Sequence, residues 1–591
     1  MNEKDASSGS EAGGEAKASP SHRGLVCRML VKRKSLKSIL EESEQDQHAR
    51  GAKLKLFDLL CIGIGSTIGS GVFVLTSKAL IVAGPAAVLS WCLAGIICLL
   101  SSSSYMELSA RLPTKGSCYV FSYHGMGEVV GVIGSVCLTM EYGISGSGVA
   151  RSWAAKVYEL MDRWWVVCYN GATAPSPGCN ADDDYYLDPV AALITVLCIL
   201  IIAQGMDMGK LVINSFTCAK VLLVAFMITA GFSCWTGNMF ESAETFVPTG
   251  AAGVLSSTSL LFFGFIGFDE VCCMSSKADD PSRTMPRALG GTLIGAALIS
   301  GTAQLALAAM VPYHEGMSST PFEAAFFAHG FKVGHWLVHI GELVLLPLVV
   351  LLSILPQPEV TAAMSEDGLM PSLFSKRSKR NGTYVRGTLV VGIVLTLVSV
   401  AVPFAVLWDV ISIGVLFSFN LTNAALINVR YGNGGTLEEP FVDVLVWVLL
   451  GLCCTAGYSC NLGVAAPIFA GNPADSMYLV ISLLAAFGAL SVAVAIYLRF
   501  ETKCDMDEPA IFKAFGVPFV PALAMFCNFF LLSTLPLKSV GYFAIFLVAF
   551  LFFYAGYVSS KSGRVGRPKD VEDSHSEDAS EVDSDETSDS W

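Results

Sequence analysis

Apolar segments of about 20 residues recur along this chain from Phe57 almost to its end, and they constrain the fold more than any other feature. About 20 residues is the length that an α-helix needs to cross the hydrocarbon core of a bilayer. We count about fourteen such segments. Their expected starts are Phe57, Pro85, Tyr119, Asp188, Leu211, Gly253, Arg287, Leu337, Arg386, Val406, Val442, Met477, Val517 and Val540.

The composition excludes an ordinary soluble domain. Hydrophobic residues make up 53% of the 591 residues and charged residues only 15%, values far from those of soluble globular proteins. We therefore predict an all-α integral membrane protein with about 14 transmembrane helices. The two ends differ from this body, because the first 20 or so residues are mostly Gly, Ser, Ala and charged residues and the last 25 or so are mostly Ser, Asp and Glu. We expect both to be disordered tails.

The distribution of lysine and arginine predicts which side of the membrane each loop faces. Basic residues gather before span 1, between spans 6 and 7, between spans 8 and 9, and after spans 12 and 14. Opposite loops such as "WTGNMFESAETFVPTG" contain no lysine or arginine. By the positive-inside rule, the basic loops and both termini face the cytoplasm. The net charge of −13 comes mostly from the C-terminal tail and says little about partners of the membrane body.

The first span contains "GIGSTIGSGVFVLT", residues 63–76, with glycine, serine and threonine where leucine would form a better helix. Every backbone N–H and C=O group in hydrocarbon must be paired, so such a break persists only inside protein or beside a polar cavity. The amide end of the following half-helix suits a carboxylate, and the carbonyl end of the preceding half suits an ammonium group or a cation. Close packing of small residues such as Gly65 and Gly69 is the alternative explanation.

A second interruption, in span 6, favours the polar cavity. The stretch "SLLFFGFIGFDEV" carries Gly264 and Gly267 inside an aromatic run, followed directly by Asp269 and Glu270. Spans 1 and 6 are five spans apart, as expected if spans 1–5 and 6–10 are inverted repeats with matching broken helices. This correspondence predicts a secondary active transporter. A free α-amino and a free α-carboxyl group would together satisfy both sets of exposed backbone groups, so we expect an amino acid substrate.

Six motifs, in order along the chain, resemble those of one known family. They are "GIGSTIGSGVFVLT", "AGPAAVLSWCLAGI", "EYGISGSGVARSW", "FFGFIGFDEV", "AMSEDGLMP" and "LWDVISIGVLFSFNLTNAALINVRY". From about Phe57 to Gly556 the chain thus resembles the cationic amino acid transporters of the amino acid–polyamine–organocation superfamily. The resemblance implies a LeuT-like 5+5 inverted-repeat core with four additional C-terminal spans. It also implies transport of arginine, lysine or ornithine by alternating access.

The same resemblance implies a division of the chain and a location. We expect a cytoplasmic, partly disordered tail in residues 1–52, a ten-helix core in 53–432, four further transmembrane helices in 433–558, and an acidic cytoplasmic tail in 559–591. We expect residence in the plasma membrane. A vacuolar or lysosomal membrane is the alternative, because no address motif stands out.

The residues expected to bind the substrate also follow from the resemblance. The carboxylate of the substrate is expected to meet Ser66, Thr67, Gly69, Ser70 and Gly71. Its α-amino group is expected to meet carbonyl groups near Phe263, Gly264 and Ile266, with Phe268 as an aromatic gate.

Charged residues inside spans are costly and are therefore functional candidates. Glu141 in span 3 matches the glutamate of the family's "EY" motif and is a candidate to face a cationic side chain, with a structural hydrogen bond as the alternative. Lys220 in span 5 is a candidate for proton coupling, because burial favours its neutral form. Proton-coupled bacterial relatives carry a lysine at this place, so we expect proton symport, with a purely structural cation as the alternative.

Three further charged residues lie inside spans or at a span end. Glu107 and Arg111 lie at a span end, and we expect them to snorkel toward the interface. Asp269 is expected either to hold the broken helix in place or to touch the substrate.

Span 8 departs from the family pattern. Glu359 stands where the family usually has an arginine ahead of "AMSEDG", and the span also contains Glu342. Extra negative charge is compatible with a cationic substrate. An altered range, including neutral amino acids or a broad range, is the alternative.

Two other functional classes are alternatives to a transporter. "HWLVH" places His335 and His339 on one helical face with Glu342 one turn on, a spacing that resembles metal ligands. Trp336 occupies the place where the hydrolase signature needs a glutamate, so we do not expect an enzyme, a metal or a cofactor. An amino acid sensor of the same fold that does not transport stays an alternative. The expected partners are the substrate, protons and lipid, with no nucleic acid.

Cys168 and Cys179 differ from the other cysteines, most of which lie within apolar spans. Both fall in the predicted extracytoplasmic loop "VVCYNGATAPSPGCNADDDYY". An oxidising compartment would permit a local disulfide there, so these two residues are the disulfide candidates.

Overall fold

The computed structural model describes most of the membrane body and leaves out both ends and several loops. The described residues are 32–49, 53–69, 71–160, 187–204, 210–235, 242–311, 321–378, 383–432, 440–469, 472–502 and 511–565. Within these ranges the regular structure is helical, with one isolated parallel bridge between Leu54 and Ala278.

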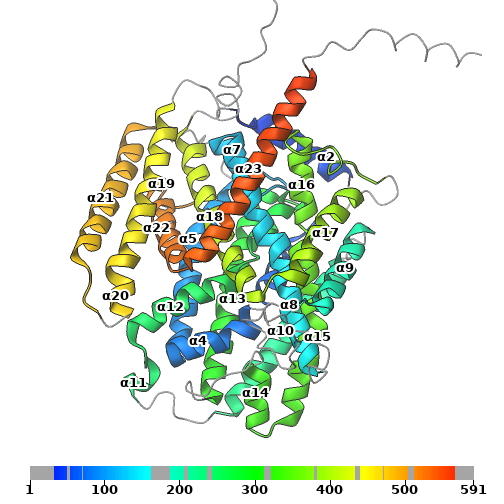
Figure 1. Ribbon diagram of the computed structural model, residues 1–591, viewed down its shortest axis with the longest axis vertical. Coiled ribbons are helices and arrows are strands. Elements are labelled where there is room, and N and C mark those ends of the chain that lie inside the picture. The colour runs from blue at the N-terminus through cyan, green and yellow to red at the C-terminus, as the bar shows by residue number, and fades with distance from the viewer. Residues whose placement is uncertain are drawn as a thin grey trace, which may run out of the picture.

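The helices run mostly along one direction and pack side by side (Figure 1). In chain order they are α2 (Leu36–Ala49), α3 (Leu56–Thr67), α4 (Thr76–Ala83), α5 (Ala87–Arg111), α6 (Cys118–Met126), α7 (Glu128–Leu138), α8 (Ser145–Leu160), α9 (Pro189–Ala203), α10 (Lys210–Ser233), α11 (Ala243–Phe246), α12 (Gly250–Phe262), α13 (Pro281–Met310), α14 (Pro321–Ala328), α15 (Lys332–Ile354), α16 (Gln357–Glu366), α17 (Val385–Ala401), α18 (Phe404–Tyr431), α19 (Pro440–Cys460), α20 (Ala466–Phe469), α21 (Ser476–Arg499), α22 (Phe519–Ser533) and α23 (Leu537–Val565).

The described part of the chain contains 11 helical segments that are long and apolar enough to cross a membrane. Three shorter apolar helices, α9, α17 and α22, stand where further spans were expected near Asp188, Arg386 and Val517. The protein is therefore an all-helical, multi-pass membrane protein. The count of fourteen spans and the inverted repeat stay predictions.

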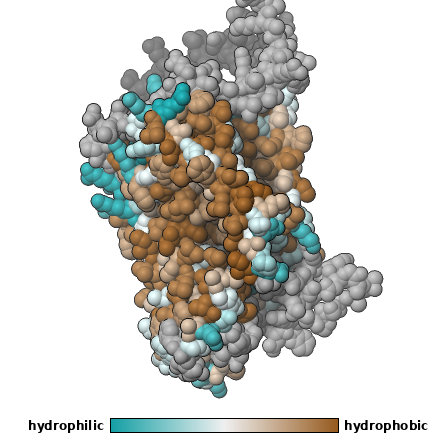
Figure 2. Space-filling view, turned by 90° about the vertical axis from the view of Figure 1, so that its left-hand side faces the viewer, coloured by the Kyte–Doolittle hydropathy of each residue, from teal (hydrophilic) through white to brown (hydrophobic). Residues whose placement is uncertain are grey.

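The surface agrees with a membrane environment. Figure 2 shows a continuous hydrophobic surface over the middle of the face it presents. Large apolar side chains of the peripheral helix α21 are exposed, among them Leu483 at 61%, Phe487 at 70% and Leu498 at 75%. Lipid tails are as apolar as these side chains, so their exposure costs no free energy in a bilayer.

The third span begins later than its expected start at Tyr119. Gly127 has a φ of 113°, a conformation that glycine adopts readily and other residues rarely do. It separates the short helix α6 from the span, which runs over Glu128–Tyr158. The apolar run before Gly127 is buried in protein, where His124 contacts the carbonyl oxygen of Lys34 at 2.7 Å.

The basic segment before span 1 binds acidic groups at one end of the molecule. Lys32 pairs with Glu128 at 3.0 Å, and Lys34 pairs with Asp367 at 2.8 Å. In Figure 1, α2, α16 and the C-terminal end of α23 lie at this upper end, while α11, α14 and α20 lie at the opposite end. The basic segment before span 1 and the C-terminal end of α23 thus lie at the same end of the molecule, and the side of the membrane that this end faces stays a prediction.

Helix α18 forms the centre of the packing, and the last helices form its edge. In the most apolar window of the span Val406–Tyr431, 89% of residues are buried, compared with 28% for Ser476–Arg499 and 17% for Leu537–Lys561. The C-terminal helices α19, α21 and α23 thus have large lipid-facing surfaces. This arrangement is compatible with a central core and added C-terminal helices, a division that stays a prediction.

The expectation that Glu107 snorkels is wrong. Glu107 is fully buried and binds Arg430 of α18 through both carboxylate oxygens, while Arg111 donates to it at 3.0 Å. The amide of Ala514 donates to the same carboxylate at 2.7 Å, and Arg430 donates to the carbonyl of Ala514 at 2.8 Å. Because these groups belong to α5, α18 and the segment before α22, Glu107 links the centre to the C-terminal helices.

We predict that Glu107→Gln lowers the stability of the protein by about 3–5 kcal/mol, because it removes the negative charge of a buried ion pair with Arg430. The melting temperature of the purified protein in detergent measures the effect. Lys37→Gln is the matched control, since Lys37 and Glu41 form an exposed pair at 3.8 Å whose loss costs less than about 1 kcal/mol. Equal melting temperatures for both variants would contradict the prediction.

Candidate functional site

The predicted break in span 1 is confirmed. Helix α3 ends at Thr67, and Ile68 is extended, with φ −79° and ψ 92°. The chain resumes as a π-helical turn at Gly71–Leu75 before α4. The local sequence explains the interruption, because β-branched residues and glycines are poor helix formers.

The predicted break in span 6 is also confirmed. Helix α12 passes into a 3₁₀ turn at Phe263–Phe265, and Ile266 is extended, with φ −62° and ψ 141°. Gly267 then has a φ of 111°, which favours glycine. The second half of the span is a 3₁₀ segment, Asp269–Lys277.

The two breaks touch each other through their glycines. A Cβ atom on Gly71 would lie 2.7 Å from the Cα atom of Gly264, and one on Gly267 would lie 2.8 Å from the Cβ atom of Ser66. A larger side chain at either Gly71 or Gly267 would push the two interruptions apart. The glycines therefore serve both explanations raised by the sequence, since they pack closely and they open the helices.

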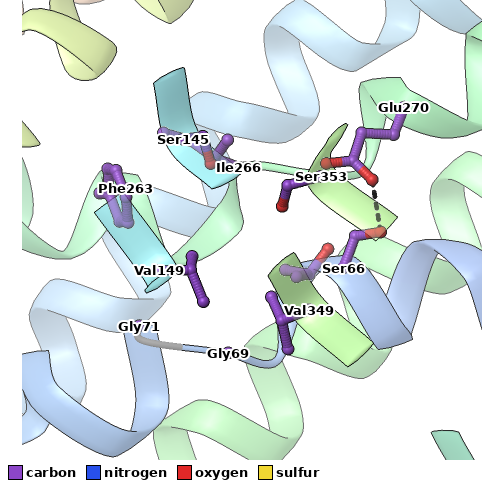
Figure 3. Close-up of a pocket in the computed structure, with 11 residues that line it drawn as sticks. Ser66, Gly69, Gly71, Ser145, Val149, Phe263, Ile266, Glu270, Val349 and Ser353 are labelled. Carbon is purple, nitrogen blue, oxygen red and sulfur yellow. Dashed lines mark hydrogen bonds between the residues drawn. The ribbon is translucent and has the colours of Figure 1, made fainter. Parts of the chain in front are cut away.

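A small cavity lies at this junction (Figure 3). Its lining comes from both breaks and from α8 and α15, and consists of Ser66, Thr67, Gly69, Gly71, Ser145, Val149, Phe263, Ile266, Glu270, Val349 and Ser353. Its volume is about 20 Å³, room for a single water molecule. An amino acid therefore enters only if the lining helices move apart.

Two buried polar contacts hold the broken span 1. The hydroxyl of Ser66 donates to Glu270 at 2.5 Å, shown as the dashed line in Figure 3. The ammonium group of Lys220, which is fully buried on α10, donates to the carbonyl of Gly65 at 2.6 Å. Lys220 and Glu270 also attract each other through their charges. The last turn of α3 is thus tied to α10 and to the second half of span 6.

The structure brings most of the predicted substrate-binding residues together. Six of them line the cavity: Ser66, Thr67, Gly69, Gly71, Phe263 and Ile266. Ser70, Cys168 and Cys179 lie outside the described residues. Gly264 lies beside the cavity, and the space for its side chain is occupied by Trp91, whose ring would be 2.3 Å from an added Cβ atom.

Phe268 and Glu141 lie outside this lining. Phe268 packs edge-on against Tyr105 and Phe419, with ring centroids 5.9 and 5.3 Å apart. Glu141 is fully buried and accepts a hydrogen bond from Ser418 of α18 at 3.2 Å.

The carboxyl groups of Glu141 and Asp269 form a buried acidic pair, in contact with each other. Tyr142 donates to one oxygen of Asp269 at 2.7 Å. Within the described part of the chain, one oxygen of each carboxyl group has no hydrogen-bond donor. The pair thus has unused capacity to accept a proton or a cation.

Several lining residues were not singled out from the sequence. Glu270 was noted only as part of a mid-span acidic pair, and that position was the signal that marked it. Ser145, Val149, Val349 and Ser353 had no such signal, because small polar and aliphatic residues are ordinary in spans. Their role depends on the packing of α8 and α15 against the breaks.

The "HWLVH" histidines form hydrogen bonds, and the acidic residues of span 8 form ion pairs. His339 donates to Glu323 of α14 at 2.9 Å, and Glu342 pairs with Lys156 of α8. Glu359 lies 3.7 Å from Lys277. The residues that the structure describes hold no group of three or more His, Cys, Asp or Glu arranged for a metal ion.

Comparison with known proteins decides the family. A family model described as "Amino acid permease" matches residues 54–456. "Cationic amino acid transporter 3, mitochondrial" from Arabidopsis thaliana is 32% identical over 412 residues, which cover 68% of this chain and 67% of that protein. The chain belongs to the cationic amino acid transporter family.

Other relatives show the breadth of the resemblance. "Cationic amino acid transporter 1" from Arabidopsis thaliana is 26% identical over 540 residues, 89% of this chain and 86% of that protein. "Methylthioribose transporter" from Bacillus subtilis (strain 168) is 29% identical over 434 residues, 73% of this chain and 92% of that protein. The family therefore consists of transporters, and its relatives' names cover more than one substrate.

We predict that Gly264→Ala destabilises the protein by about 1–3 kcal/mol, because the new methyl group overpacks against the fully buried Trp91. The melting temperature in detergent is the measurement. Gly451→Ala in α19 is the matched control, since nothing lies within 4 Å of its added Cβ atom. A helix-favouring alanine there should leave the melting temperature unchanged or raise it, and a similar rise for Gly264→Ala would refute the packing role.

Proposed function

We propose that the protein is a secondary active transporter that moves amino acids by alternating access, with arginine, lysine and ornithine as the preferred substrates. The observation that carries the proposal is the cavity at the junction of the two broken spans. Its lining combines backbone at both interruptions with the side chains of Ser66, Thr67 and Glu270. A cavity built on two broken helices is the arrangement by which transporters bind small charged substrates.

The two ends of an amino acid match two sides of this cavity. We assign the α-carboxylate to the segment from Ser66 to Gly71, including Ser70, where a half-helix begins again. We assign the α-ammonium group to carbonyl groups at Phe263, Gly264 and Ile266. Glu270 adds a negative charge to the lining, beside Ser66.

The acidic pair supports a cationic side chain. Lining residues within the described ranges include Glu270 but no lysine or arginine. Asp269 precedes Glu270 on the same half of span 6, and both Asp269 and its neighbour Glu141 are fully buried. A cation that reaches Glu141 and Asp269 would satisfy their unused oxygens and neutralise a costly buried charge. Phe268, on the same segment, is our candidate for an aromatic gate.

Lys220 supports proton coupling. When protonated, its ammonium group holds α10 to the carbonyl of Gly65 and balances Glu270. Loss of the proton removes the attraction to Glu270 and weakens the hydrogen bond to Gly65, because a neutral amine is a poorer donor than an ammonium group, and this favours separation of the first half of span 1 from α10. One proton thereby biases two arrangements of the broken helix, which is what symport requires.

A neutral or broad substrate range is the second candidate, favoured by the relative named as a methylthioribose transporter. Glu342 and Glu359 do not decide between the two, because each is paired with a lysine. We further propose cytoplasmic termini, a core in residues 53–432 with C-terminal helices in 433–558, and residence in the plasma membrane.

The substrate proposal predicts uptake of labelled arginine into proteoliposomes, competed by lysine and ornithine more strongly than by neutral amino acids. Glu141→Gln should reduce arginine uptake about tenfold or more, an effect of at least about 1.4 kcal/mol. Uptake of any neutral substrate should fall less. Glu244→Gln, at an exposed acidic residue of α11, is the control. Equal losses for both substrate classes would make Glu141 structural, and binding without net flux would indicate a sensor.

The coupling proposal predicts that an inward proton gradient drives arginine accumulation above equilibrium when the membrane potential is clamped. Clamping is necessary because each elementary charge that crosses 100 mV contributes about 2.3 kcal/mol. Lys220→Ala should lose accumulation and retain exchange, while Lys332→Ala, at an exposed lysine, should behave as wild type. If the gradient has no effect on the wild-type protein, Lys220 is a structural cation and the protein is a uniporter.

A further inference from the structure

A buried cluster of charged side chains joins three helices, and the proposed function makes no use of it. The cluster consists of Lys156 of α8, Glu323 of α14, and His339 and Glu342 of α15, and each of these side chains is at most 6% exposed. Val349 of α15 lines the central cavity. A helix rise of about 1.5 Å per residue places His339 roughly 15 Å from Val349 along α15. The buried cluster is thus separate from the candidate substrate site.

The four side chains of the buried cluster contact one another in sequence. The Nδ1 atom of His339 lies 2.9 Å from one carboxylate oxygen of Glu323. The other oxygen of Glu323 lies 3.8 Å from the Nζ atom of Lys156, and Glu342 pairs with the same ammonium group. Glu342 also interacts through its charge with Glu323 and His339. The four groups therefore form one electrostatic unit.

Besides the buried cluster, His339 faces a second histidine and an aromatic ring. His335 lies one turn earlier on α15, with ring centroids 6.4 Å apart, and its Nδ1 atom contacts a backbone carbonyl of α14 at 3.1 Å. Trp336 packs edge-on against His339, with centroids 6.0 Å apart. Helix α10 also packs against this part of α15, where it presents Leu223 to Gly341. Helices α3 and α9 meet α15 further along, nearer the central cavity.

The charges of the buried cluster balance when it holds one extra proton. Two carboxylates face one ammonium group, so a neutral His339 leaves a net charge of −1 in a buried position. A proton on His339, or on Glu323 through their contact, makes the cluster neutral. An uncompensated buried charge is strongly destabilising. Histidine is also the side chain that most readily changes its charge between about pH 5 and 8.

Helix α14 connects the buried cluster to the first broken span. Its buried residues are Pro321, Phe322, Glu323, Ala325 and Phe326, and Glu323 is the charged residue in its sequence. The helix packs against α13, α15 and the π-helical turn Gly71–Leu75, which follows the first break. The state of the buried cluster therefore affects how firmly α14 is held against that turn.

We propose that the contact between Glu323 and His339 is a proton-operated fastening of α14. With the extra proton the buried cluster is neutral, and α14 stays docked on α15 and on the turn Gly71–Leu75. Without that proton, one uncompensated negative charge favours hydration of Glu323, and α14 separates from α15. Because α14 lies at the end opposite α2, its release opens a route from that end toward the central cavity. This consequence for transport rests on the proposed function, whereas the docking of α14 does not.

Hydrogen–deuterium exchange of the substrate-free full chain in lipid nanodiscs measures the docking of α14. The protection factor of its amides is corrected for the pH dependence of intrinsic exchange. It should fall at least about tenfold from about pH 5.5 to about pH 8.5, since an equilibrium linked to one proton changes by up to about tenfold per pH unit. His339→Gln, which cannot take up the proton, should show the low value at both pH values. Glu323→Gln, which keeps the hydrogen bond but removes the excess negative charge, should show the high value at both.

Two further variants complete the comparison. Glu342→Gln removes one negative charge from another position in the buried cluster. It should also show the high value at both pH values, so the test stays valid if Glu323→Gln does not fold. His329→Gln, at an exposed histidine between α14 and α15, should respond to pH as the wild type does.

Two results would overturn the fastening. Equal protection of α14 at both pH values in the wild type would show that no proton controls its docking. A pH response of His339→Gln equal to that of the wild type would exclude His339 as the group that takes up the proton.

Arginine exchange, measured with the same pH on both sides of the proteoliposome membrane, tests the consequence for transport. At about pH 5.5 it should be severalfold faster in His339→Gln than in the wild type, because α14 is already released. Equal rates there would overturn the link between α14 and opening. Failure of the proposed function is distinct, since the wild type would then exchange none of the amino acids in the competition panel, while the protection of α14 would still change with pH.

Discussion

The pairing of backbone groups at two helix breaks is the constraint on which the rest of this structure depends. An interrupted helix in a bilayer leaves amide and carbonyl groups that only protein or enclosed water can satisfy. Here the two interruptions lie against each other, with Gly71 beside Gly264, and the carbonyl of Gly65 receives the ammonium group of Lys220. The neighbouring helices α5, α8, α10 and α15 surround them, because exposure of these breaks to lipid would be costly.

Much of the fold follows from the sequence alone. The length and recurrence of apolar runs predict the spans, and glycine-rich stretches predict both breaks, because these features act locally. Gly127 was harder to interpret, since a single glycine inside an apolar run is often tolerated in a helix. The buried pairing of Glu107 with Arg430 was missed for another reason. Its partner lies 323 residues away along the chain, and only tertiary packing brings them together.

Some residues of the candidate site could likewise be predicted from the sequence, and others depend on tertiary packing. Residues on the two breaks, such as Ser66 and Phe263, were predictable because they lie in the interruptions themselves. Lys220 was singled out as a charged residue inside a span, and it donates a hydrogen bond to the carbonyl of Gly65 at the first break. Val349 and Ser353 were not predictable, because their contribution depends on which face of α15 turns toward the breaks. The contact between Glu141 and Asp269 likewise depends on how two distant spans pack.

Helix α23 contacts both ends of the molecule, and this has a mechanical consequence. Ser539 near its start donates to Asp409, and Lys561 near its end donates to the carbonyl of Gly368 at 3.4 Å. A rigid helix with a rise of about 1.5 Å per residue fixes the separation between these two attachment points at about 33 Å. A rearrangement that slides α18 along its axis relative to the end of span 8 changes that separation, so it strains these two hydrogen bonds. The peripheral helix thereby determines which movements of the core are free and which carry an energetic penalty.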